Sequence, residues 1–210
     1  MTQMVAWELA TRQRRARIAT ALLLVAVAGC TPAAKLTVDR DVAVPMRDGI
    51  ALRADIYRPS RGGPFPVLVF RTPYGKHNAA QDYRIHLKAV ERGYAVVLQD
   101  VRGRYASDGH FNPYRQEGGD GYDTIEWAAS QAWSNGRIGT YGLSYPGAVQ
   151  WLAAMEQPPH LQSMVPAMTF SSPRNFFYMN GIFDLSWLPG STSTSHRMRG
   201  AGWACLTTEA

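Results

Sequence analysis

Apolar and polar residues alternate along two stretches of the chain, residues 35–44 and residues 50–58. The segment Arg47-Asp48-Gly49 between them has the composition of a tight turn. A period of two on either side of a turn is typical of antiparallel strands, because successive strand residues face opposite sides of a sheet. This part of the sequence therefore predicts a β-hairpin.

Buried strands and helices then follow each other in turn. Residues 67–70 form an apolar run after a Gly/Pro-rich connector at 59–66, as expected for a strand covered on both faces. In chain order we expect a strand at 67–70, a helix at 82–92, a strand at 94–98, a helix at 120–133 and a strand at 137–141. A helix with Pro146 in its first turn, which continues over 148–155, and a strand at 161–167 follow. This alternation predicts an α/β fold with a mostly parallel sheet, whose ligands bind beyond the carboxyl ends of the strands. Asp120 and Asp123 are expected to cap the helix that begins near them.

Residues 1–29 have the features of an export signal rather than of a folded domain. Four arginines at positions 12–17 precede an apolar run at 18–28, which is shorter than the about 20 residues that span a bilayer. The run ends in Val27-Ala28-Gly29-Cys30, which resembles the bacterial lipobox. We therefore expect an exported protein, held at the membrane only through a lipid on Cys30. An ordinary signal peptide, giving a periplasmic or extracellular protein, is the alternative.

Composition and charge narrow the classes of partner. With 46% apolar and 18% charged residues the chain is typical of one main globular domain. The formal net charge is +6, and the four Arg and one Glu of the leader supply +3 of it, which leaves +3 for residues 30–210. The remaining basic residues are scattered, so we expect no nucleic-acid partner. With Cys30 lipidated, Cys205 is the one other thiol, which excludes an intrachain disulfide and a cysteine metal site. No cofactor is expected.

The most informative segment is Gly142-Leu143-Ser144-Tyr145-Pro146-Gly147, which lies between a predicted strand and a predicted helix. A serine at a sharp strand-to-helix turn needs small neighbours, and Gly142 and Gly147 provide them. Pro146 suits the first turn of a helix, where a missing N–H costs nothing. The spacing is G-x-S-x-x-G rather than the commoner G-x-S-x-G of a nucleophile elbow. The pattern and its position indicate Ser144 as a catalytic nucleophile, with an ordinary loop as the alternative.

Several further segments occur together with this turn, in a fixed order. The sequence resembles the CocE/NonD-type serine hydrolases, a group that includes the cocaine-esterase-like proteins, the α-amino-acid ester hydrolases and the related X-prolyl dipeptidyl-peptidases. The resemblance covers residues 44–187, the greater part of the mature chain. The segments that carry it, besides 142–147, are Met46-Arg47-Asp48-Gly49, Ala54-Asp55-Ile56-Tyr57-Arg58-Pro59, Arg71-Thr72-Pro73-Tyr74, Asp100-Val101-Arg102-Gly103-Arg104 and Ser134-Asn135-Gly136-Arg137-Ile138-Gly139.

The resemblance implies an α/β-hydrolase fold and a role for three residues. Ser144 is implied as the nucleophile, the backbone N–H of Tyr145 as one oxyanion donor and the phenol of Tyr74 as the second. Tyr74 follows the strand at 67–70, so we expect it at the same edge of the sheet as Ser144. Arg102 is expected to have a structural role.

A general base for Ser144 is not apparent. In α/β-hydrolases the order along the chain is Ser, then Asp or Glu, then His. His77, His86 and His110 precede Ser144, His160 is expected about 15 Å away at the far end of the following helix, and His196 lies in a region without periodicity. We expect a hydrolase domain over 30–170 that is incomplete at its C-terminus. The start of a helical cap, implied by the resemblance, follows over 171–189, and an irregular tail over 190–210.

These observations favour a serine hydrolase of esters or amides that acts on a small-molecule ester or a peptide through an acyl-enzyme, and that is catalytically incomplete in this chain. Peptidase, esterase and acylase activities are not distinguished by the sequence, and no oligomeric state is indicated. Two alternatives remain. One is a lipid-anchored non-catalytic binding protein or vestigial fragment of a longer hydrolase, and the other is a chain that does not fold alone because its sheet edge is uncovered.

Overall fold

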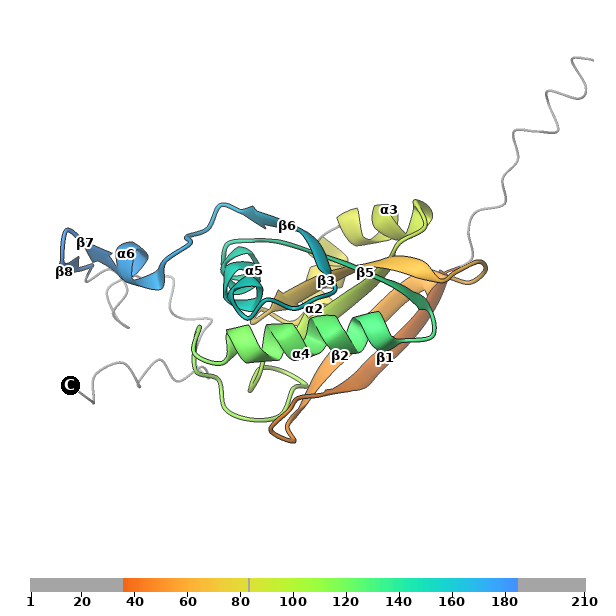
Figure 1. Cartoon of the computed structure of the whole chain (residues 1–210), viewed down its shortest axis with the longest axis horizontal. Helices are drawn as coiled ribbons and strands as arrows, with labels where there is room; N and C mark the ends of the chain where they lie inside the picture. The colour runs from red at the N-terminus through yellow and green to blue at the C-terminus, as the bar shows by residue number, and fades with distance from the viewer. Residues whose placement is uncertain (1–35, 83, 185–210) are drawn as a thin grey trace, which may run out of the picture. The chain divides into compact units, whose positions relative to one another are not determined.

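Six strands form one sheet in the order β1-β2-β4-β3-β5-β6 (Figure 1). The computed structural model describes residues 36–82 and 84–184. The strands are β1 (Leu36–Pro45), β2 (Ala51–Pro59), β3 (Phe65–Thr72), β4 (Ala95–Asp100), β5 (Ser134–Leu143) and β6 (Leu161–Ala167). Strands β4, β3, β5 and β6 run parallel to one another. The expected α/β fold with a mostly parallel sheet is confirmed.

The first two strands form the predicted hairpin. β1 pairs with β2 in antiparallel register, from Leu36 opposite Pro59 to Pro45 opposite Ala51. In the turn between them, the Gly49 N–H donates to the Met46 carbonyl at 3.0 Å. β2 then pairs antiparallel with β4, so the hairpin extends the parallel strands on one side.

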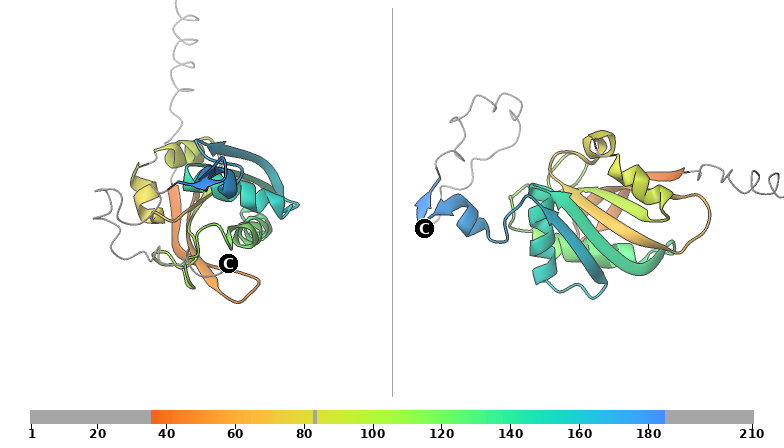
Figure 2. Two further views of the ribbon diagram at one scale, coloured as in Figure 1. Left: turned by 90° about the vertical axis from the view of Figure 1, so that its left-hand side faces the viewer. Right: turned by 90° about the horizontal axis from the view of Figure 1, so that it is seen from above.

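Helices cover both faces of the sheet (Figure 2). On one face lie α2 (Lys76–Asp82) and α3 (Ile85–Glu91), where Ala79 and Val90 pack with Val96 and Leu98 of β4. On the other lie α4 (Glu117–Ser130) and α5 (Tyr145–Met155), which share a core cluster with Ala95 and Val97. Alternate residues of β4 therefore enter opposite cores, as a strand between two helical layers requires.

Two predicted helices have different bounds in the structure. A single helix was expected at 82–92, but α2 and α3 are separate, and the first of them begins at Lys76. The Lys76 N–H donates to a carboxylate oxygen of Asp100 at 2.6 Å, so a strand distant in sequence provides a partner at the start of α2. The helix expected at 120–133 begins at Glu117 and ends at Ser130.

The expected capping role of Asp120 and Asp123 is wrong in its detail. Gln116 is the N-cap of α4 and its side chain makes no capping hydrogen bond. Asp120 lies in the first turn of the helix, where its carboxylate pairs with Arg102, and Asp123 pairs with Arg47 in the hairpin turn. Long-range arginine partners, rather than local N–H groups, bind these two carboxylates.

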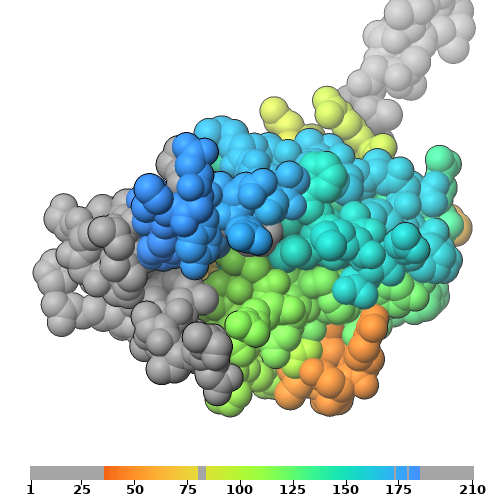
Figure 3. Space-filling model, turned by 60° about the vertical axis from the view of Figure 1, so that its left-hand side comes forward, coloured from red at the N-terminus to blue at the C-terminus, as the bar shows by residue number. Residues whose placement is uncertain are grey.

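The described chain ends in small elements beyond β6. These are α6 (Pro173–Phe177), β7 (Tyr178–Met179) and β8 (Ile182–Phe183), shown in blue in Figure 3. The helical cap expected from residue 171 onward stays a prediction, since residues 185–210 lie outside the described part. Within 36–82 and 84–184, none of the helices has the length and apolar character needed to cross a bilayer.

Candidate active site

Ser144 lies at the sharp turn between β5 and α5, at the carboxyl end of the parallel strands. Its backbone has φ 64° and ψ −121°, a conformation that a residue with a side chain rarely adopts. The side chain is exposed, and the Ser144 N–H donates to the Ala167 carbonyl of β6 at 3.0 Å. A strained, exposed serine between a strand and a helix is the arrangement of a nucleophile elbow.

The two glycines of the turn are required by close contacts. A Cβ atom on Gly142 would lie 2.5 Å from Cβ of Pro146 and 2.7 Å from its backbone. A Cβ on Gly147 would lie 2.8 Å from Cγ2 of Thr169 and 2.9 Å from the Ala167 carbonyl oxygen. Backbone atoms can move away only if the turn itself changes. The small neighbours expected from the sequence are therefore a steric requirement of this bend.

Tyr145 follows the nucleophile as the first residue of α5. Its backbone N–H belongs to the first turn of the helix, where N–H groups have no partner within the helix and the dipole favours negative charge. Its ring is buried and stacks on Tyr114, with 4.4 Å between the centroids. The hydroxyl donates to Oε1 of Glu117 at 2.8 Å. Burial, then the nearby Glu117, raises the pKa of the Tyr145 phenol, so the hydroxyl stays protonated.

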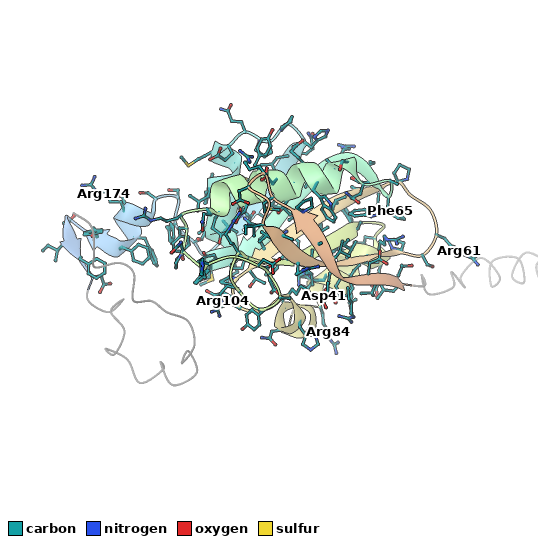
Figure 4. The ribbon with its side chains drawn as sticks, turned by 90° about the horizontal axis from the view of Figure 1, so that it is seen from below. Asp41, Arg61, Phe65, Arg84, Arg104 and Arg174 are labelled. Atoms are coloured by element: carbon teal, nitrogen blue, oxygen red, sulfur yellow. The ribbon has the colours of Figure 1, made fainter. Side chains whose placement is uncertain are left out.

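Tyr74 lies beside Tyr145, in the loop after β3. The two rings are arranged edge to face, with 6.4 Å between their centroids, and the Tyr74 side chain is about half exposed. Two hydrogen bonds hold this loop in place. The Tyr74 N–H donates to Oγ1 of Thr72 at 3.1 Å, and Nε of Arg104, labelled in Figure 4, donates to the Pro73 carbonyl at 3.0 Å. The structure thus brings Tyr74 to the edge of the sheet that carries Ser144, where the sequence predicted it.

A set of buried charged side chains lies beneath the turn. The sequence predicted only the structural role of Arg102 among them. We call Arg71, Arg102, Glu117 and Asp120 the buried charge network. Arg71 Nη2 lies 2.9 Å from Oε2 of Glu117, and Arg102 Nη2 lies 2.5 Å from Oδ1 of Asp120. Burial raises the pKa of Glu117, although Arg71 and the Tyr145 hydroxyl act in the opposite direction. The network connects β3, the loop after β4 and α4 under the residue next to the nucleophile.

Two histidines in the described part of the chain, His86 and His160, are not placed as bases for Ser144. His160 precedes β6 at the amino end of β5, and its Nδ1 lies 2.7 Å from Oε2 of Glu126. His86 is buried under the sheet beside Tyr141, whose hydroxyl contacts its Nδ1. Burial lowers the pKa of His86 to about 4. The expectation that His160 lies at the wrong edge is confirmed by this geometry, whereas His196 lies outside the described residues.

Residues 36–82 and 84–184 contain no group of three or more His, Cys, Asp or Glu side chains that could hold a metal ion. Cys30 and Cys205 both lie outside these residues, so the lipidation predicted at Cys30 stays a prediction.

This turn, on a sheet with helices on both faces, is that of an α/β-hydrolase. A family model described as X-Pro dipeptidyl-peptidase (S15 family) matches residues 48–202. The chain belongs to this family, which confirms the resemblance seen in its motifs.

Comparisons with individual proteins agree with this assignment. The chain is 43% identical over 135 residues to the cocaine esterase of Rhodococcus sp. (strain MB1 Bresler), a match that covers 63% of this chain and 24% of that protein. It is similar to the crystal structure of a CocE/NonD family hydrolase from Staphylococcus aureus, at 35% identity and a TM-score of 0.61, over 67% of this chain and 29% of the other. An α-amino acid ester hydrolase structure gives 29% identity and a TM-score of 0.59, over 68% and 26% of the two chains. The chain spans about a quarter of the length of the curated relatives it matches.

Proposed function

We propose that Ser144 is the nucleophile of a serine hydrolase that cleaves esters or amides of small molecules or peptides through an acyl-enzyme. The observation that carries this proposal is the exposed Ser144 at φ 64°, immediately before the N-terminus of α5. Similarity to a cocaine esterase, to an α-amino acid ester hydrolase and to the X-Pro dipeptidyl-peptidase family supports the substrate class.

In this mechanism Oγ of Ser144 attacks the substrate carbonyl carbon while its proton passes to a base. The carbonyl oxygen becomes an oxyanion, which accepts hydrogen bonds from the Tyr145 N–H and the Tyr74 hydroxyl. The tetrahedral intermediate then expels the alcohol or amine, which takes a proton and leaves the acyl group on Ser144. Water attacks this ester in the second half of the reaction and releases the acid. Each oxyanion donor is expected to lower the barrier by about 3 kcal/mol.

We further propose that the described residues hold the nucleophile and the oxyanion donors but no base. Within 36–82 and 84–184, His86 contacts Tyr141 and His160 contacts Glu126. Both histidines lie away from the edge of the sheet that carries Ser144. A serine site without its base retains roughly 10³-fold to 10⁴-fold rate enhancement over water from the oxyanion hole and substrate binding. Slow, site-specific acylation is therefore the behaviour to expect from this part of the chain.

A fluorophosphonate probe tests the nucleophile. The purified full chain is incubated with the probe, and the modified residue and its rate are read by mass spectrometry. We expect labelling at Ser144 that is faster than at any other serine, slower than in a hydrolase with an intact triad, and absent in Ser144→Ala. Tyr74→Phe should slow it further, because the ring stays and the hydroxyl is lost. Uniform labelling of several serines would refute the nucleophile, and labelling at the rate of an intact triad would refute the missing base.

A non-catalytic binding role is the second candidate, favoured by the position of His86 and His160 away from Ser144 within 36–82 and 84–184. A protein of this kind would bind an acyl ester without cleaving it, so no alcohol would be released. Calorimetric titration with a p-nitrophenyl ester, followed by assay of free p-nitrophenol, separates the two roles. Binding without release in both the wild type and Ser144→Ala would favour the binding protein over the hydrolase.

We also propose that the protein is exported and anchored to the membrane by a lipid on Cys30. The support is the basic and apolar pattern of residues 1–29 and the four-residue motif that ends in Cys30. Cys30→Ala should move the protein from the membrane fraction to the soluble or unprocessed fraction of a bacterial host. An unchanged distribution with an ordinary cleavage site would favour a simple signal peptide.

A further inference from the structure

The side chain of Gln150, in the middle of α5, lies directly behind the turn that carries Ser144. It is only 3% exposed. Its Nε2 donates to the carbonyl oxygens of Pro146 at 2.9 Å, Val165 at 3.2 Å and Gly142 at 3.4 Å. Its Oε1 accepts from the Val165 N–H at 3.0 Å and from the Thr140 hydroxyl at 3.1 Å. One carboxamide thus joins β5, the first turn of α5 and β6.

Two of these contacts bracket the nucleophile. Gly142 lies two residues before Ser144, and Pro146 lies two residues after it. Both carbonyl groups are held by the same nitrogen atom, so the two arms of the bend are fixed relative to each other. A backbone in a sparsely populated conformation persists only where its surroundings determine it. The Gln150 side chain contacts both arms of this bend from inside the fold.

An apolar side chain of similar length would need no hydrogen-bond partners at this position, whereas a buried amide is costly unless its hydrogen bonds are made. The Gln150 side chain makes its main-chain hydrogen bonds within the bend or with Val165 of β6. The same strand accepts the Ser144 N–H through the Ala167 carbonyl. These contacts hold the main chain on both sides of Ser144 and Tyr145, which hydrophobic packing alone would not do.

We propose that Gln150 is a positioning residue that holds the Ser144 bend, and with it the Tyr145 N–H, in the geometry that nucleophilic attack requires. This inference rests on the proposed function for its catalytic consequence, but the restraint of the bend is a property of the fold alone. Gln150 touches neither substrate nor reacting atoms, and it acts through the main chain of Gly142 and Pro146.

The test compares two substitutions of Gln150 in the full chain. Gln150→Met keeps the length and removes all five hydrogen bonds, while Gln150→Glu keeps an acceptor for Val165 and Thr140 but loses the donor to Gly142 and Pro146. Both variants should label at Ser144 at least about tenfold more slowly with the fluorophosphonate probe, as expected when a reacting group is misplaced. Amide hydrogen exchange should become faster in the peptide that contains residues 142–148.

Two control variants separate positioning from general stability. Thr140→Val removes one hydrogen bond of the same carboxamide but leaves its contacts with the bend, so labelling should stay within about twofold of wild type. Leu52→Ala lowers stability from β2, in a part of the core distant from the turn in sequence, and should leave exchange at 142–148 unchanged under conditions where the protein is folded.

The outcomes distinguish this inference from the proposed function. Normal labelling and normal exchange in folded Gln150→Met would overturn it. Equal slowing in Leu52→Ala and Gln150→Met would overturn it as well, since general stability would then explain the effect. If wild-type Ser144 is not labelled at all, the proposed nucleophile fails, and the exchange measurement alone decides whether Gln150 restrains the bend.

Discussion

The Tyr145 hydroxyl donates to the buried Glu117 carboxylate at 2.8 Å, so the residue after the nucleophile is anchored to a different helix. Tyr145→Phe keeps the ring and the backbone N–H but leaves this carboxylate oxygen without its donor. We expect a loss of about 1–3 kcal/mol in the free energy of unfolding, because a buried acceptor becomes unsatisfied. Urea denaturation measures the loss, with Tyr94→Phe at an exposed ring as the control. Equal stability of both variants would contradict this role of the hydroxyl.

The glycines of the turn give a second, steric prediction. Gly147→Ala places a methyl group within 3 Å of the Ala167 carbonyl and of Thr169, so the bend must shift. We expect a loss of roughly 1–3 kcal/mol in stability, as for overpacked sites, and strongly reduced labelling of Ser144.

Gly119 provides the matched control, because a Cβ there meets nothing within 4 Å. It lies inside α4, where Gly→Ala is expected to raise stability by about 0.5–1 kcal/mol. Thermal unfolding of the two variants should therefore shift in opposite directions. A shift in the same direction would show that the close contacts at Gly147 are easily relieved.

Arg102 and Arg47 both pair with an aspartate of α4, but only Arg102 is buried. Arg102→Met leaves Asp120 buried with a more distant partner, 3.9 Å away on Arg71, and should cost about 3–5 kcal/mol. Arg47→Met disrupts a pair whose arginine side chain is 56% exposed, for which about 0–1 kcal/mol is typical. Chemical denaturation of both variants checks the contrast, and similar costs would contradict it.

His86 gives stability a pH dependence. Burial lowers the pKa of His86 in the folded protein from its ordinary value of 6.5 to about 4. Since the unfolded chain binds the proton more readily, the contribution of neutral His86 is full above pH 6.5 and is lost as the pH falls to about 4. His86→Gln should reduce the slope of unfolding free energy against pH in this window by up to about 1.4 kcal/mol per pH unit. Parallel slopes for the two proteins would disprove this assignment.

Local patterns predicted the sheet and the turn well, because both depend on neighbouring residues. The hairpin, the buried strands and the Ser144 bend follow from periodicity of two, apolar runs and the spacing of Gly142 and Gly147. The break between α2 and α3 was missed, as was the true start of α4. Asp100 provides a partner at the start of α2, and Gly118 and Gly119 obscured the first turn of α4 in the sequence.

The interactions around the site depend on contacts between distant segments, so the sequence could not show them. Nothing local indicates that Arg71 reaches Glu117, or that the Gln150 carboxamide meets Val165. The motifs supplied Tyr74 only through a family resemblance, because a loop tyrosine by itself has no distinguishing pattern. Sequence reasoning thus identified the residues at the surface of the site more readily than those that support it.

The buried charge network has one outer end, because Arg102 Nη1 also donates to Asp48 in the hairpin turn at 2.7 Å. A continuous series of polar contacts therefore runs from that turn through Arg102, Asp120, Arg71 and Glu117 to Tyr145. The amino-terminal hairpin therefore supports the edge of the sheet that carries Ser144. A protease cut or an insertion at Asp48 would therefore disturb the contacts of Tyr145 beside Ser144, although almost half of the chain separates Asp48 from Ser144.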